Sequence, residues 1–263
     1  MAQRYNISNS IHPTALIDPS AELGTNVCVG PFSIIQANVF LGDNTTIGNH
    51  VTVGENTSIG KDCRIFHSSS IGEIPQDLKF GGELTNTIIG ERTTIREFVT
   101  VNRGTKALGE TKIGSDCLLM AYVHVAHDCI LGNNVIMANM ATLGGHVEIG
   151  DWASLGGGVL VHQFCKIGDH AFIGGGFRVV QDVPPFILAA GEPLSFGGTN
   201  RIGLKRRGFT AGDRKIIKGF YQLFFRSELN RSEALQKIDT QIEASQYKDQ
   251  ILDFIRSSER GII

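Results

Sequence analysis

An apolar residue recurs at every sixth position along most of the sequence. The series starts at Ile11, is interrupted twice and ends at Val179. Its members are Ile11, Ile17, Leu23, Val29, Ile35, Leu41, Ile47, Val53, Ile59, Ile65, Ile71, Ile89, Ile95, Val101 and then every sixth residue from Ile113 to Val179. This hexad is the signature of a parallel β-helix, in which six residues form one flat side and 18 residues form one triangular coil.

The other hexad positions, counted from this apolar residue, agree with the interpretation. The second position is often glycine, as in Gly24, Gly42 and Gly132, which suits a site near a tight corner. The fifth position is small or β-branched, and we expect the first and fifth positions to point inward. Four of the five cysteines occupy the fifth position. They are predicted to fill the core rather than to act as ligands or nucleophiles.

Breaks in the hexads suggest the domain organisation. The pattern falters at about 73–88 and 103–112, which we predict to be loops that leave the coil. It stops in QDVPP at 181–185, where two prolines end regular strand pairing. We predict an all-β solenoid over 1–190 and a small α-helical domain over 191–263.

Capping signals define the expected helices of the second domain. Thr210 with Asp213, and Asn230 with Glu233, each resemble a capping box at the start of a helix. The segment ILDFI suggests a last helix.

Composition narrows the class of protein. The 263 residues are 41% hydrophobic with a net charge of −2, which gives no general case for a nucleic-acid partner. An odd number of cysteines without a CxxC pair favours free thiols in a reducing compartment. The N-terminus lacks the apolar core of a signal peptide. The sequence contains no run of 18 apolar residues, so no membrane-spanning helix is expected. We therefore expect a soluble, cytoplasmic protein.

The histidines lie outside the inward positions, so they are not expected to be core residues. Stepping by one coil places His127, Gly145 and Gln163 in one column, and Asp128, His146 and Phe164 in the next. His124 and His162 belong to the same neighbourhood. Both interruptions are also predicted to leave the coil on this face.

A second unusual feature is a stack of glycines. Gly156–Gly158 and Gly174–Gly176 lie one coil apart, which leaves a strip without side chains. The strip could hold a long apolar ligand or the close surface of a neighbouring chain, and both could hold if the ligand lies between subunits.

The histidine cluster allows either metal binding or proton transfer. A metal-dependent β-helix lyase would need several metal ligands to converge on one point. The residues that follow His127 in its column are Gly145 and Gln163, which are not usual metal ligands, so no metal is expected. A histidine near its ordinary pKa of about 6.5 can instead accept a proton from a sugar hydroxyl. Asp128 could orient it, although neighbouring strand side chains point apart and a corner would be required. The Gly145 N–H could stabilise an oxyanion.

Several longer segments resemble the UDP-N-acetylglucosamine O-acyltransferases of lipid A synthesis. The resemblance spans nearly the whole chain and is carried by IGEIPQDLKF (71–80), REFVTVNRGT (96–105), GSDCLLMAYVHVAHDCILGN (114–133), VHQFC (161–165), QDVPP (181–185) and GLKRRGF (203–209). It implies a left-handed β-helix and a homotrimer with sites between neighbouring prisms.

The resemblance also implies roles for individual residues. His127 matches the general base, Asp128 its partner and Gly145 the oxyanion donor. The expected substrate-binding residues are Gln76, Asp77, Lys79, His124, His146, His162, Gln163, Gly175, Asn200 and Arg206.

The implied substrates are UDP-N-acetylglucosamine and an (R)-3-hydroxyacyl-acyl carrier protein, with no cofactor. Asn102 and Ile202 depart from the family pattern. Transfer to a 3-amino sugar, which would form an amide, therefore remains an alternative.

Overall fold

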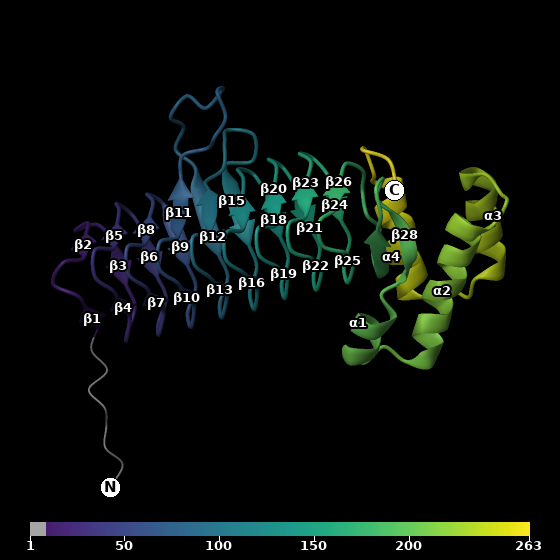
Figure 1. Ribbon diagram of the computed structural model, residues 1–263, viewed down its shortest axis with the longest axis horizontal. Helices are drawn as coiled ribbons and strands as arrows, with labels where there is room; N and C mark the ends of the chain where they lie inside the picture. The colour runs from purple at the N-terminus through teal and green to yellow at the C-terminus, as the bar shows by residue number, and fades with distance from the viewer. Residues whose placement is uncertain (1–8) are drawn as a thin grey trace, which may run out of the picture.

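The hexads form a parallel β-helix in the computed structural model, which describes residues 9–263 (Figure 1). Three sheets make its flat sides. The first sheet contains β1 (Ser10–Ile11), β4 (Cys28–Val29), β7 (Thr46–Ile47), β10 (Arg64–Ile65), β13 (Thr94–Ile95), β16 (Leu118–Leu119), β19 (Ile136–Met137), β22 (Ser154–Leu155), β25 (Phe172–Ile173), β27 (Ile187–Ala190) and β28 (Ser195–Thr199). The second contains β2 (Leu16–Ile17), β5 (Ile34–Ile35), β8 (Thr52–Val53), β11 (Ser70–Glu73), β14 (Thr100–Asn102), β17 (His124–Val125), β20 (Thr142–Leu143), β23 (Leu160–Val161) and β26 (Arg178–Val179). The third contains β3 (Glu22–Leu23), β6 (Phe40–Leu41), β9 (Thr57–Ile59), β12 (Asn86–Ile89), β15 (Glu110–Ile113), β18 (Ile130–Leu131), β21 (Glu148–Ile149) and β24 (Lys166–Ile167).

Strands of the prism pair in parallel with the equivalent strand of the next coil, and the last pair of the first sheet, β27 with β28, is antiparallel. Ile136 pairs with Ser154, for example, one regular coil further along the chain. Two coils are longer, because Arg64 pairs with Thr94 and Thr94 with Leu118. Each longer coil adds a whole number of hexads, so the hexad phase survives both interruptions. This is why stepping by coils remains valid on both sides of the loops.

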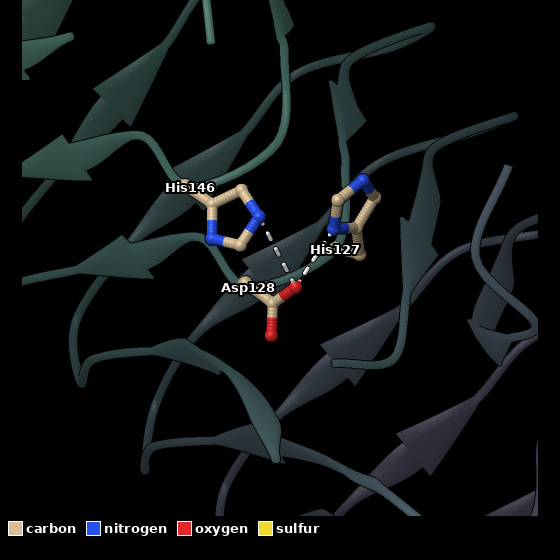
Figure 2. A group of neighbouring side chains, drawn as sticks. All are labelled: His127, Asp128 and His146. Carbon is tan, nitrogen blue, oxygen red and sulfur yellow. Dashed lines mark hydrogen bonds and ion pairs between the residues drawn. The ribbon is translucent and has the colours of Figure 1, made fainter. Parts of the chain in front are cut away.

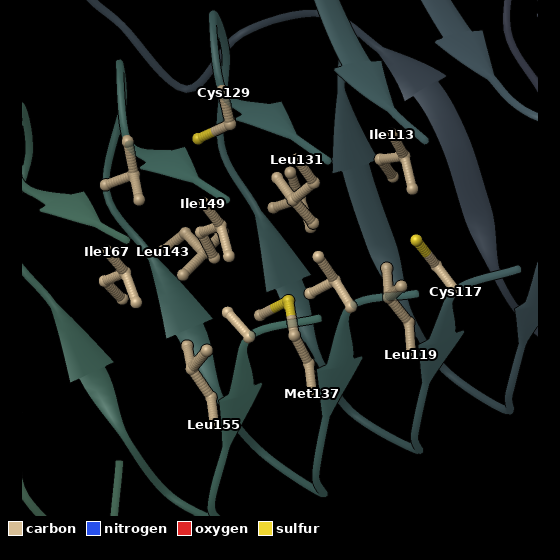
Figure 3. Packing of buried hydrophobic residues seen from close by; sticks show 14 of the residues in the cluster. Ile113, Cys117, Leu119, Cys129, Leu131, Met137, Leu143, Ile149, Leu155 and Ile167 are labelled. Carbon is tan, nitrogen blue, oxygen red and sulfur yellow. The ribbon is translucent and has the colours of Figure 1, made fainter. Parts of the chain in front are cut away.

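The first and fifth hexad positions are buried along the prism, as predicted. Leu131, Leu143 and Cys129 are at most 1% exposed and point into the same core (Figure 3). The first coil is less covered, and Ile11 there is 36% exposed.

Fifth-position side chains also satisfy backbone carbonyls of the next coil. Thr45 donates its hydroxyl to the Gly60 carbonyl at 2.8 Å, and the thiols of Cys117 and Cys129 lie 3.2 Å from the carbonyls of Gly132 and Gly144. Four cysteines are buried, as predicted, and only Cys28 is partly exposed. Serine, threonine and cysteine at this position therefore fill the core and donate to a buried acceptor at once.

The corners turn at the fourth hexad position. Asn44, Asp116 and Asp128 there have φ values of 58°, 59° and 59°, in the left-handed region where Asn and Asp are enriched.

The second-position glycines are needed for a different reason from the one expected. A Cβ on Gly42 would lie 2.5 Å from the Lys61 nitrogen, so glycine permits the close approach of successive coils.

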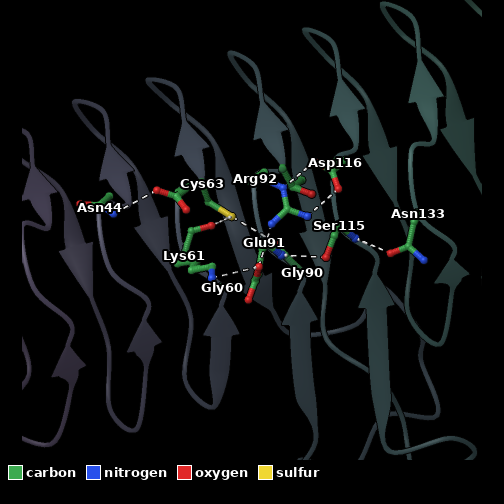
Figure 4. A network of polar contacts seen from close by, with 12 residues as sticks. Asn44, Gly60, Lys61, Cys63, Gly90, Glu91, Arg92, Ser115, Asp116 and Asn133 are labelled. Carbon is green, nitrogen blue, oxygen red and sulfur yellow. Dashed lines mark hydrogen bonds and ion pairs between the residues drawn. The ribbon is translucent and has the colours of Figure 1, made fainter.

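A ladder of polar side chains joins successive coils at the corner between the third and first sheets (Figure 4). The Ser115 N–H donates to Asn133 Oδ1 at 2.9 Å, and the Arg92 guanidinium donates to both carboxylate oxygens of Asp116 at 2.7 Å. Such bidentate bonds are geometrically specific. The Asn133 side chain satisfies a backbone N–H, whereas the Arg92–Asp116 bonds link two side chains of successive coils.

Two loops leave the prism between the second and third sheets, side by side in Figure 1. We call the segment between β11 and β12, residues 74–85, the first loop, and the segment between β14 and β15, residues 103–109, the second loop. Backbone bonds tie their bases together, because Arg103 N–H donates to the Glu73 carbonyl at 2.9 Å and Asn86 N–H to the Gly109 carbonyl at 2.9 Å. The loops therefore form one projection above the prism.

The described part of the chain has four helices, which cover the end of the prism: α1 (Arg201–Arg206), α2 (Ala211–Arg226), α3 (Arg231–Gln241) and α4 (Gln246–Arg256). Both predicted capping boxes are present, at Thr210 and at Asn230. Within residues 9–263, no helix is long and apolar enough to cross a membrane. The boundary at residue 190 stays a prediction. β27 and β28 pair across it, and residues 1–8 lie outside the described part.

Candidate active site

His127 and Asp128 form a hydrogen-bonded pair at the corner between the second and third sheets. His127 Nδ1 lies 2.7 Å from Asp128 Oδ2 (Figure 2). Two neighbouring residues in an extended strand would point apart, but Asp128 has a φ of 59°. The left-handed residue supplies the corner that the sequence argument required, and it turns both side chains toward each other.

The Asp128 carboxylate is fully buried, yet donors surround it. Thr105 donates its N–H to Oδ1 at 2.9 Å and its O–H to Oδ2 at 2.7 Å, and Leu108 N–H lies 3.3 Å from Oδ1. Burial alone would raise the pKa of Asp128, but hydrogen bonds from His127 and Thr105 hold that pKa below its ordinary value. Asp128 is therefore a carboxylate at neutral pH.

Gly145 lies directly against the His127 ring. A Cβ built on Gly145 would be 2.6 Å from His127 Cε1 and 2.7 Å from Nε2, so only glycine leaves room for this ring position. Among residues 9–263, no group accepts a hydrogen bond from the Gly145 N–H. The structure thus places Gly145, which carries this free N–H, against the Cε1–Nε2 edge of the imidazole.

Two further histidines flank the pair. His146 stacks on Phe164 with ring centroids 4.5 Å apart, and its Nε2 lies 3.7 Å from Asp128 Oδ2. His124 Nδ1 lies 2.8 Å from the Thr100 hydroxyl. Desolvation lowers the pKa of both His124 and His146, so both are neutral at pH 7.

His127, Asp128 and His146 could also be considered as metal ligands. One ligand atom from each falls within 4.8 Å of the others, and no other such group occurs in the described part of the chain. However, Asp128 Oδ2 already accepts from His127 and Thr105. A metal would have to displace these bonds from a fully buried carboxylate, so the donor set fits a proton-transfer pair better.

The first loop carries Gln76, Asp77 and Lys79 above this corner. Gln76 and Lys79 are exposed, and Asp77 is half-buried, with Oδ1 accepting from the Lys79 N–H at 3.0 Å. The charge of Asp77 acts on the pKa of His146, which places this carboxylate near the histidines. The loop is therefore close enough to form part of the same site.

His162 and Gln163 lie one coil beyond Gly145 and are exposed. The Arg260 guanidinium lies 3.2 Å from His162 Nδ1, which brings the end of the chain to this face. Sequence reasoning gave Arg260 no role, because no periodicity links the C-terminal segment to the prism.

Gly175, Asn200 and Arg206 do not join His127 within one chain. Gly175 follows β25 at the corner between the first and second sheets, on the opposite edge of the second sheet from His127. Asn200 and Arg206 line a cavity of about 460 Å³ between α1 and the first sheet. Asn200 is 8% exposed and caps α1, accepting from Gly203 N–H and donating to the His170 carbonyl.

Comparison with known proteins decides the family. Residues 182–263 match the family described as Udp N-acetylglucosamine O-acyltransferase, domain 2, and residues 110–145 match the bacterial transferase hexapeptide repeats. The chain is 51% identical over 259 residues to the acyl-[acyl-carrier-protein]--UDP-N-acetylglucosamine O-acyltransferase of Paracidovorax citrulli, covering 97% of this chain and 99% of that protein. The enzyme of the same name from Janthinobacterium sp. (strain Marseille) is 49% identical, with 96% and 98% covered.

The chain belongs to the UDP-N-acetylglucosamine O-acyltransferase family. Solved structures agree: the Bacteroides fragilis acyltransferase superposes with a TM-score of 0.94 at 45% identity, covering 96% of this chain and 99% of that one. The Francisella novicida enzyme gives a TM-score of 0.92 at 40% identity, with 96% and 93% covered. The expected fold and family are therefore confirmed.

The structure also shows a site residue that sequence reasoning missed. Thr105 makes two of the hydrogen bonds to Asp128. The sequence offered a partial signal, because the second loop was expected to leave the coil on the face of Asp128. It could not show that the loop folds back onto the carboxylate.

Proposed function

We propose that His127 is the general base in the reaction of this family, acyl transfer to UDP-N-acetylglucosamine in the first step of lipid A biosynthesis. The observation that carries this assignment is the juxtaposition of three groups: the His127 imidazole, the ionised Asp128 and the Gly145 N–H. A base, its orienting carboxylate and an oxyanion donor are what direct acyl transfer requires.

The proposed reaction needs no covalent enzyme intermediate. His127 Nε2 takes the proton of the sugar 3-hydroxyl while the oxygen attacks the thioester carbonyl carbon of an (R)-3-hydroxyacyl-acyl carrier protein. The Gly145 N–H stabilises the resulting oxyanion. Collapse breaks the carbon–sulfur bond, and the leaving thiolate takes the proton from the His127 imidazolium, which restores the enzyme.

We assign substrate contacts to residues on two sides of the prism. Gln76, Asp77 and Lys79 of the first loop, with His124, His146, His162 and Gln163, would surround the sugar and the carrier arm. Gly175 would line the acyl groove, and Asn200 and Arg206 would lie near the nucleotide. Because the second group sits across the second sheet from His127, a complete site needs a neighbouring prism.

A homotrimer is therefore part of the proposal. Exposed apolar side chains follow the corner between the first and second sheets, where Phe32, Tyr122 and Met140 are 57%, 58% and 62% exposed. Within this row Phe98 stacks on Tyr122, with ring centroids 5.0 Å apart. Such a row on a lone chain is typical of an association surface. We place the enzyme in the cytoplasm, where acyl carrier protein is available.

One departure from the family pattern concerns the acceptor. Asn102 is 4% exposed and donates to the Ile74 carbonyl at 2.9 Å, so it braces the first loop. Its presence therefore gives no reason to favour a 3-amino sugar. We propose the 3-hydroxyl as acceptor.

A mass-resolved assay tests the role of His127. Purified protein is given UDP-N-acetylglucosamine or its 3-amino analogue, with acyl carrier proteins of several chain lengths. His127→Ala should lose about 10²- to 10⁴-fold in kcat, the range for a general base. His12→Ala, an exposed histidine of the first coil, should keep activity within about twofold, as distant surface changes do. Equal turnover by His127→Ala and the unchanged protein would reject the base.

Mixed oligomers test whether sites lie between chains. His127→Ala and Arg206→Ala variants are purified separately, then unfolded, mixed and refolded together. Random assembly should restore about a quarter of the sites, because a site can combine an intact His127 with an intact Arg206 from a neighbour. No recovery in mixtures that contain hybrid trimers would contradict the shared site.

A further inference from the structure

The second loop closes over the Asp128 carboxylate. In the described residues 9–263, all the backbone and hydroxyl donors to its side chain come from this loop: the N–H and O–H of Thr105 and the N–H of Leu108. Thr105 is itself 7% exposed. The loop therefore supplies three of the bonds that hold the buried carboxylate, and His127 of the prism corner supplies another.

The direction of each proton along this chain of bonds follows from the chemistry of its members. Ala107 N–H donates to Thr105 Oγ1 at 3.2 Å, so the threonine oxygen is an acceptor there and its own proton points to Asp128. A carboxylate only accepts, so His127 Nδ1 must also carry a proton toward Oδ2. Nε2 of the neutral ring is thereby left with the lone pair.

The loop is built as a preformed unit. Gly109 N–H donates to the Thr105 carbonyl at 2.7 Å, and Gly104 N–H donates to the Asn86 carbonyl at 3.2 Å. A Cβ on Gly104 would come within 2.3 Å of the Glu110 nitrogen, so the loop base is closely packed. Rotation of Asp128 would break the Thr105 and Leu108 bonds together, because the loop cannot follow the carboxylate.

We propose that Thr105 is a positioning residue for acyl transfer, fixing the Asp128 carboxylate so that His127 is held in the tautomer with a basic Nε2. The inference rests on the proposed role of His127 as the base. Thr105 touches neither substrate nor reacting atoms, and it acts only through Asp128.

Three variants separate this role from a purely structural one. Thr105→Val keeps the shape and N–H but removes the hydroxyl, and Thr105→Ser restores the hydroxyl. The matched control is Thr93→Val: Thr93 is fully buried and donates its hydroxyl to the Gly114 carbonyl at 2.9 Å, at the corner between the third and first sheets. Steady-state kinetics, the pH profile of kcat/KM and thermal unfolding are measured for each.

Thr105→Val should lower kcat by about 10- to 100-fold, the worth of a hydrogen bond to a charged group, with KM changed less than about twofold. The acid limb of kcat/KM should move to higher pH. With one donor fewer, the carboxylate attracts the imidazolium more strongly, and the neutral base is present only at higher pH. Thr105→Ser should stay within about threefold of the unchanged protein and keep its pH profile, and Thr93→Val should do the same because its lost bond lies outside the site.

Unchanged kcat and pH profile in Thr105→Val would overturn the inference. So would equal losses in Thr105→Val and Thr105→Ser, or a Thr93→Val profile that moves as far. Should the valine variant not fold, Thr105→Ala carries the same expectations and the same refuting results. If His127→Ala is inactive but Thr105→Val behaves like the unchanged protein, the proposed function stands and only this inference fails.

Discussion

Gly145→Ala is a direct perturbation of the proposed geometry. Gly145 lies against the His127 ring, and an added Cβ would sit 2.6 Å from His127 Cε1 and 2.7 Å from Nε2. Ordinary carbon contacts begin near 3.4 Å, so the ring must move by about 0.8 Å, since the backbone of the stacked coils resists movement.

That displacement is large on the scale of the site. The His127–Asp128 bond is 2.7 Å long, and a shift of this size would stretch it towards the limit of a hydrogen bond. A misplacement of about 1 Å can cost about 100-fold in rate. We therefore expect kcat to fall about 100-fold, with KM changed less than threefold because the proposed mechanism uses only the backbone N–H of Gly145.

The assay is steady-state acyl transfer, paired with thermal unfolding to show that the variant is folded. Gly212→Ala is the control, because a Cβ there meets only Thr210 Oγ1 at 3.6 Å, at the start of α2. A Gly145→Ala enzyme with kcat within threefold of the unchanged protein would refute the argument that ring position limits the rate. A raised KM with an unchanged kcat would refute the same argument.

Three other outcomes follow from the same structure. Asp128→Asn should lower kcat about 10³- to 10⁴-fold in the acyl-transfer assay. The amide oxygen will face the N–H groups of Thr105 and Leu108, so the NH₂ group faces His127 and selects the wrong tautomer. Retained activity in this variant would exclude the proposed orientation of His127 by Asp128. Burial lowers the pKa of His170 to about 4, so the unfolded chain binds one proton more between about pH 6.5 and 4, and stability falls as the pH drops through that window. Since His170 is partly exposed, we expect the free energy of unfolding to fall by about 1–2 kcal/mol between pH 7 and pH 4.5, measured by urea unfolding. The fall should be smaller for His170→Phe, which keeps the stacking on Phe186. Equal falls in the two proteins would contradict the assignment to His170. Cys129→Ser should keep the free energy of unfolding, measured in urea, within about 1 kcal/mol of the unchanged protein, because a hydroxyl can replace the thiol bond to the Gly144 carbonyl. Cys129→Val leaves that acceptor unpaired and should lower the free energy of unfolding by about 1–3 kcal/mol. A valine variant more stable than the serine variant would show that side-chain volume alone matters.

Periodicity predicted the prism because each hexad position has one direction in space. Ile113 and Cys117 could be assigned to the interior by counting, and both are buried. The role of glycine could not be read in the same way, because the close approach of Gly42 to Lys61 is a contact between coils. Helical spacing was expected from about residue 200, but the bounds of the short helix α1 could not be read, because its six residues span fewer than two turns and its cap, Asn200, lies just after β28.

The same distinction applies to the site. His127 and Gly145 could be placed in one column because both belong to regular hexads, and the built contact of 2.7 Å to Nε2 shows how close they are. Thr105 and Arg260 lie on segments without periodicity. Their contacts depend on how a loop and a chain end fold back, and no spacing rule encodes that path.

The two loops are thus what distinguishes this corner from the others. Elsewhere, a corner side chain meets its equivalent one coil away, as Asn44 meets Asp62 at 3.0 Å. At Asp128 the preceding coil is replaced by the second loop, which supplies Thr105 and Leu108 in place of a ladder partner. A repeat can stack identical groups but cannot surround one carboxylate with different donors. Interrupting the repeat next to His127 is therefore how the fold converts a structural corner residue into an oriented carboxylate.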